Sequence, residues 1–94
     1  MDINRFTHKA QEAALAAVEL ARRSGHAEAR PVHLLKVLVD ARDGVVAQVL
    51  GRVGVDLDQV GVEVTAVLNR LPTVSGGAEP PVSRALRDVL VAAH

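Results

Sequence analysis

Cysteine, tryptophan and tyrosine are absent from the sequence, and Phe6 is its only aromatic residue. Without cysteine the chain has no disulfide, no thiolate nucleophile and no cysteine-bound zinc. The other apolar residues are almost entirely Val, Leu and Ala, and such small side chains favour closely packed helices over a spacious pocket with aromatic walls. The composition therefore predicts a small, tightly packed domain.

An excess of charge of one sign is lacking as well, because 11 Lys and Arg residues balance 11 Asp and Glu residues. No basic tract is present, so the composition does not indicate a nucleic-acid partner. No stretch reaches the ~20 apolar residues of a membrane span, and charges occupy the place where a signal peptide needs an apolar run. The sequence thus predicts a cytoplasmic, soluble module with no membrane partner.

The spacing of the apolar residues predicts an all-α fold, and the length of 94 residues leaves room for one small domain. The first helix is predicted over residues 7–24, with Thr7 as its N-cap and Gly25 as the left-handed residue after its end. Its apolar stripe lets another helix approach closely, because most of its members are alanine. The stripe consists of Phe6, Ala10, Ala13, Ala14, Ala17 and Ala21.

Three more helices are predicted before Pro72. The second begins at Pro31 and ends near residues 43–44, and the third covers 45–53. Asp56 and Gln59 form an approximate capping box for the fourth, which reaches residue 71. Its pattern is mixed, because three valines alternate as in a strand and a central glycine weakens a helix by ~1 kcal/mol. The cap, the proline and the later apolar spacing favour a helix.

Residues 73–82 contain Gly-Gly and Pro-Pro, which is linker chemistry. Ser83 then caps a fifth helix over 83–94, with Leu86, Val89, Leu90 and Ala93 on one face. A free helix of this length is marginal in water, so we expect it to dock on the first four.

Residues 82–94 repeat the pattern of residues 6–18, with a hydroxylic cap, an acidic position and an apolar face in register. The offset suggests a repeat of about 76 residues whose second copy has just begun. We therefore predict a first four-helix repeat over 1–72, a linker over 73–82, and the first helix of an incomplete second repeat over 83–94.

Four segments together resemble the Clp N-terminal domain family over all 94 residues: DINRFTHKAQEAALAAVELARRSGH, RPVHLLKVLVD, DGVVAQVLGRVGVD and LNRLPTVSGG. The resemblance implies a helical bundle of two four-helix repeats, of which this sequence holds one complete repeat and the first helix of the second. The chain is then either part of a longer protein or a naturally short relative. The L-P-x-V-S-G-G ending of the linker is similar to that of the ClpB disaggregase branch.

The resemblance also implies a function, which is to recruit unfolded or aggregated polypeptides for ATP-driven remodelling. ATP and Mg²⁺ would be held by ATPase domains absent from this chain, in a full-length protein that assembles as a hexamer, and no cofactor is expected here. Relatives place the equivalent of Thr7 near the surface that handles aggregated proteins. They place Leu86, Leu90 and Ala92 in an apolar groove between the repeats. The structural alternatives are that Thr7 only caps a helix, and that Leu86 and Leu90 only pack the fifth helix.

Other functions keep the same fold. The domain would dock an adaptor protein for a degradative Clp unfoldase, or act as a stand-alone decoy without an ATPase. A helical scaffold unrelated to remodelling is a further alternative. Val32 precedes His33 where relatives that read arginine-phosphorylated substrates have an acidic residue, so phosphoarginine capture is not expected.

No catalytic or metal site is predicted. The four histidines have no metal-ligand spacing, and His33 is expected to satisfy buried backbone groups beside the first helix. The serines at positions 24, 75 and 83 lie at a helix end, in the linker and at a cap, and none lies in a G-x-S-x-G motif. Gly76 and Gly77 are not followed by the Gly-Lys-Ser/Thr of a phosphate loop. The sequence therefore predicts a non-enzymatic binding domain.

Overall fold

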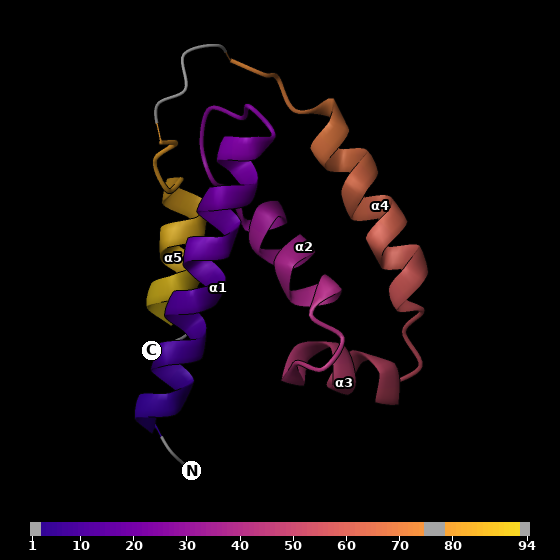
Figure 1. Ribbon diagram of the computed structural model, residues 1–94. Helices are drawn as coiled ribbons and strands as arrows, with labels where there is room; N and C mark the ends of the chain where they lie inside the picture. Colours follow the sequence, from indigo (N-terminus) through magenta and orange to yellow (C-terminus); the bar gives the residue numbers. More distant parts are fainter. Residues whose placement is uncertain (1–2, 75–78, 93–94) are drawn as a thin grey trace.

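The computed structural model describes residues 3–74 and 79–92, and in these ranges it contains five α-helices and no strand (Figure 1). The side chains are described from residue 8 onwards. The all-α prediction is confirmed. The helices are α1 (Ile3–Arg23), α2 (Pro31–Asp40), α3 (Val45–Arg52), α4 (Leu57–Arg70) and α5 (Arg84–Ala92).

The ten-residue helix α2 lies at the centre of the fold, because each of the other four helices packs against it. In Figure 1, α1 and α5 lie on one side of α2, α4 lies on the other side, and α3 lies at the far end of α2. α1 and α4 pack mainly on α2 and not on each other. Within the described residues, no helix is both long enough and apolar enough to cross a membrane.

α1 ends in a Schellman motif, which turns the chain back toward α2. The Gly25 N–H donates to the Arg22 carbonyl at 3.1 Å, and the His26 N–H donates to the Ala21 carbonyl at 2.9 Å. Gly25 has a φ of 72°, a conformation that costs a residue with a Cβ ~1–2 kcal/mol. The predicted role of Gly25 is confirmed.

The start of α1 differs from the prediction. The helix begins at Ile3, so Thr7 lies one turn inside it and is not its N-cap. Residues 3–6 contain no glycine or proline, so nothing in this segment stops the helix from extending past the threonine.

Two predicted N-caps are confirmed. The Asp56 carboxylate accepts hydrogen bonds from the N–H groups of Asp58 and Gln59, and the Ser83 hydroxyl accepts one from the Leu86 N–H at 3.0 Å. Among the described residues the reciprocal bond of a capping box, in which the Gln59 side chain would accept from the Asp56 N–H, is not formed, and the Gln59 amide donates to Glu63 at 3.4 Å. α2 ends at Asp40, three residues before the predicted stop.

The core joins α5 to α1, to α2 and to the loop between them. Leu86 of α5 is completely buried, and it clusters with small side chains from α1 and with Leu34 of α2. The predicted docking of the fifth helix on the earlier helices is confirmed. The cluster consists of Ala17, Ala21, Ala29, Leu34 and Leu86.

The described ends of the predicted linker are held against the loop between α1 and α2. The Val74 N–H donates to the Gly25 carbonyl at 2.7 Å. Ala29 forms two bonds, because its N–H donates to the Pro81 carbonyl and its carbonyl accepts from the Ser83 N–H, each at 2.8 Å. The Gly-Gly part of the predicted linker lies in 75–78, outside the described residues. The ends of the segment are therefore fixed to the domain, which its composition did not indicate.

Substitutions at two glycines can show how far backbone conformation, and not packing, determines the free energy of unfolding of the domain. A Cβ at Gly54 or at Gly61 meets no other atom within 4 Å, but Gly54 has a φ of 89° and Gly61 lies in mid-helix. We expect Gly54→Ala to destabilise the domain by ~1–2 kcal/mol and Gly61→Ala to stabilise it by ~0.5–1 kcal/mol. Chemical unfolding of both variants measures this, and equal effects would contradict the assignment.

Candidate functional site

The predicted client-binding residues of α5 have three different environments. Leu86 has 0% exposure and belongs to the core, so its side chain packs the helix against α1 and α2. Leu90 is half-buried against the same cluster, and Ala92 is exposed at the end of α5. Thr7 lies in α1, but its side chain lies outside the described part of the structure.

An exposed apolar flank runs along α5 beside the buried line of Leu86 and Leu90. It consists of Ala85, Val89 and Ala92, and their i, i+4, i+7 spacing places them on one side of the helix. Val89 is 46% exposed, whereas the apolar pattern had grouped it with the packed residues. The exposed flank and the buried side of α5 are distinguished by the placement of Leu86 in the core. The spacing of apolar residues in the sequence does not predict this placement.

Leu86 carries the attachment of α5. Because its side chain is fully buried among small residues that are already close-packed, Leu86→Ala should leave a cavity and destabilise the domain by about 2–5 kcal/mol. The matched control is Val91→Ala on the same helix, at a residue that is 67% exposed, for which we expect a change within about 0.5 kcal/mol. Denaturant unfolding of both variants provides the comparison. If Leu86→Ala and Val91→Ala lowered the free energy of unfolding by similar amounts, α5 would not be anchored by Leu86.

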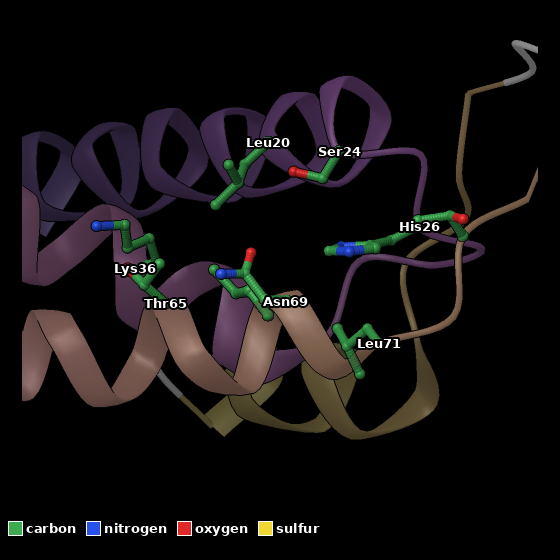
Figure 2. A pocket seen from close by; sticks show the side chains of 9 residues that line it. Leu20, Ser24, His26, Lys36, Thr65, Asn69 and Leu71 are labelled. Atoms are coloured by element: carbon green, nitrogen blue, oxygen red, sulfur yellow. The ribbon is translucent and has the colours of Figure 1, made fainter.

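A second candidate site is a cleft of about 380 Å³ between α1, α2 and α4 (Figure 2). Its walls are apolar where Leu20, Leu68 and Leu71 contribute, and polar elsewhere. α4 supplies Thr65 and Asn69. The remaining polar lining comes from the end of α1 and the residues after it, from α2, and from the segment after α4: Ser24, His26, Lys36 and Thr73.

One buried histidine, His26, lines one end of this cleft, and a second, His33, contacts it from behind. His26 has 7% exposure and His33 has 0%, and the His26 Nδ1 and His33 Nε2 atoms are 2.8 Å apart. The Arg30 N–H donates to the His33 Nδ1 at 2.9 Å, which is the acceptor role of the third helical residue in a capping box. His33 therefore accepts from a backbone group, as predicted, but this group is the part-buried N–H at the start of its own helix and does not lie beside α1.

These contacts determine where the ring protons lie. Since the Nδ1 of His33 accepts a hydrogen bond, its Nε2 carries the proton and donates to the Nδ1 of His26. His26 in turn carries its proton on Nε2, on the side of the ring away from His33. Figure 2 shows the His26 ring projecting into the cleft toward the side chains of Ser24 and Asn69. Within the described residues, no group of three or more side chains suited to hold a metal ion is found.

Burial lowers the pKa of His33 below its ordinary value of 6.5, and the neighbouring His26 ring lowers it further. The unfolded chain therefore binds a proton at His33 more readily than the folded domain does. The contribution of this group to the free energy of unfolding is complete above pH 6.5 and is lost as the pH falls from there toward the lower folded pKa.

We expect the free energy of unfolding to fall between about pH 7.5 and about pH 5.5, and His33→Gln to reduce this dependence. Glutamine keeps an acceptor for the Arg30 N–H but does not titrate. His8→Gln is the control, because His8 is exposed and its partner among the described residues is Glu12, also at the surface. Urea unfolding at several pH values gives the slopes. A His33→Gln variant with the slope of the unsubstituted protein would remove His33 from the explanation.

Comparisons with known proteins agree on one family. The model of the Clp repeat (R) N-terminal domain matches residues 5–94. The chaperone protein ClpB of Porphyromonas gingivalis is 39% identical over 94 residues, which are 100% of this chain and 11% of that protein. The chaperone protein ClpB of Mycobacterium tuberculosis is 40% identical over 85 residues, which are 89% of this chain and 10% of that protein.

A solved structure, the N-domain of ClpV from Vibrio cholerae, superimposes with a TM-score of 0.76 over 98% of this chain and 57% of that one. The sequence identity is 23%, so this likeness shows the fold alone. The chain spans about a tenth of the length of the ClpB relatives that it matches.

Proposed function

This chain belongs to the Clp repeat (R) N-terminal domain family, and from that premise we propose that it recruits unfolded or aggregated polypeptides for a ClpB-type chaperone. The ATP-driven work belongs to ATPase domains outside this chain. The observation that carries the proposal is the apolar flank of α5, Ala85, Val89 and Ala92, which is exposed while the helix itself is fixed to the core by Leu86.

The flank suits a weak and unspecific contact. Its side chains are small and uncharged, so an unfolded chain that binds there buries little apolar surface. The helix that carries them is held in place by Leu86 and by the two hydrogen bonds of Ala29. Such a contact is too small for high affinity. Tethering of the domain to an ATPase would compensate for the low affinity, because it raises the local concentration of the bound chain near the ATPase without a tight complex.

Leu90 extends the proposed surface, because it is half-buried beside the flank and part of its side chain is within reach of a bound chain. The resemblance to the family adds Thr7 to the proposed client-binding residues. Leu86 has an indirect role, because its buried side chain positions the flank without forming part of the surface.

The test is the binding of a fluorescently labelled, permanently unfolded polypeptide, measured by anisotropy. We expect weak binding of this probe and no binding of the folded protein from which the probe is made. We expect Val89→Asp to bind the probe with roughly tenfold lower affinity. Val89 is exposed, so the charge should not unfold the domain. Leu90→Asp is the second variant, expected to act in the same direction.

The matched control is Val62→Asp on α4, where the same change is made at a residue that is 64% exposed. We expect it to bind the unfolded probe like the unsubstituted protein. Equal binding by Val89→Asp and the unsubstituted protein would refute the α5 surface. Binding to folded proteins, with none to unfolded chains, would instead support adaptor docking.

A further inference from the structure

The cleft between α1, α2 and α4 lies in the first repeat, apart from the flank of α5, and has no part in the proposed recruitment surface. Its polar end is formed by the His26 ring, the Ser24 hydroxyl and the Asn69 amide (Figure 2). His26 is only 7% exposed, and within the described residues its Nε2 forms no hydrogen bond. Every buried side-chain nitrogen or oxygen among the described residues has a partner, so the unpaired His26 Nε2 is an atom in contact with solvent. A ring N–H that faces solvent at the edge of a cleft can donate to an acceptor bound there.

The direction of this N–H is set by the fold. The Arg30 N–H fixes the acceptor nitrogen of His33, His33 donates to His26, and the remaining proton of His26 is left on the atom that reaches the cleft. All three groups precede or begin α2, the helix on which the other four pack. The donor is therefore preorganised, and a ligand does not have to pay for orienting it.

The rest of the lining complements a negative charge. Lys36 is the one charged residue among the described residues that line the cleft, and no acidic side chain lines it. Lys36 lies toward the opposite end of the cleft from His26 (Figure 2), and it is paired with Asp40 at 3.1 Å, with the Lys36 side chain 24% exposed and the Asp40 side chain 54% exposed. Ser24, Thr65 and Asn69 add hydroxyl and amide donors. A carboxylate offers two oxygens to such donors, and bonds to a charged acceptor are about twice as strong as neutral ones.

We propose that this cleft binds the C-terminal carboxylate of a polypeptide whose last residue is apolar. The carboxylate accepts hydrogen bonds from the His26 Nε2–H and the Asn69 amide, and the last side chain lies against Leu20 and Leu71. The volume of about 380 Å³ is near the lower end of the range for small-ligand pockets, ~300–1,000 Å³, and fits a chain end better than a folded surface.

The test uses three probes with the isotope-labelled 94-residue chain. They are a short acetylated peptide that ends in leucine with a free carboxylate, the same peptide with a C-terminal amide, and 4-methylpentanoate, which has the carboxylate and the branched end without peptide groups. NMR titration follows the backbone amides of Ser24 and Leu68, the side-chain amide of Asn69 and the ring nitrogens of His26. We expect saturable shifts with the free-carboxylate peptide and at least tenfold weaker binding of the amidated peptide.

Two variants locate the binding. Asn69→Ala removes an exposed donor from the cleft, and Lys36→Met removes its cation, so each should weaken binding of the free-carboxylate peptide several-fold. Gln59→Ala is the matched control, because Gln59 is an exposed amide of the same helix that lies outside the cleft. Leu90→Asp should leave this binding unchanged, so the cleft and the recruitment surface are tested independently.

Each alternative result overturns the proposal. Equal binding of the acid and the amide would mean that the carboxylate is not recognised. Binding of 4-methylpentanoate as tight as that of the peptide would assign the cleft to free carboxylic acids instead of polypeptide ends. The absence of any shift at His26 and Asn69 would mean that the cleft is not a binding site.

Discussion

The fold depends on α2, a helix of ten residues that would be marginal alone in water and on which every other helix packs. Its first turn is partly buried, and His33 in that turn is completely buried, so the polar groups of this side chain need partners inside the protein. His33 meets this need by accepting the Arg30 N–H and passing its own proton to His26. One pair of neutral rings thus ties the start of the central helix to the turn that follows α1. The same requirement places a ring N–H at the mouth of the cleft.

The second constraint is the size of the side chains on α1. Ala17 and Ala21 are fully buried, and they leave room for the longer Leu86 to enter between α1 and α2. A larger residue at either alanine would push α5 outward. The sequence has almost no aromatic residues, and this part of the core is accordingly filled by one leucine from a distant segment that packs on small side chains. The buried and exposed sides of α5 follow from that single insertion.

Local chemistry predicted local structure well. Gly25, Asp56 and Ser83 were assigned from short-range rules, and each acts in the structure as those rules require. Thr7 was wrong as a cap because a hydroxylic residue marks a helix start only where the preceding residues cannot continue the helix. The family could be inferred from motifs that span the chain. The cleft could not, because it unites residues of α1, α2 and α4 whose polar side chains carry no periodic signal. The division of α5 into a buried line and an exposed flank likewise required the tertiary contacts of Leu86.

The two hydrogen bonds at Ala29 have a mechanical consequence. They join the backbone at residues 81 and 83 to the loop before α2, directly beside the buried Leu86. To detach α5, a pulling force would have to break both bonds and also extract a leucine from the core. A load applied to α5 would therefore be passed to α1, to α2 and to the loop between them, which hold Leu86 and the two bonds. Because α2 contacts every other helix, the load would reach the rest of the domain through that central helix.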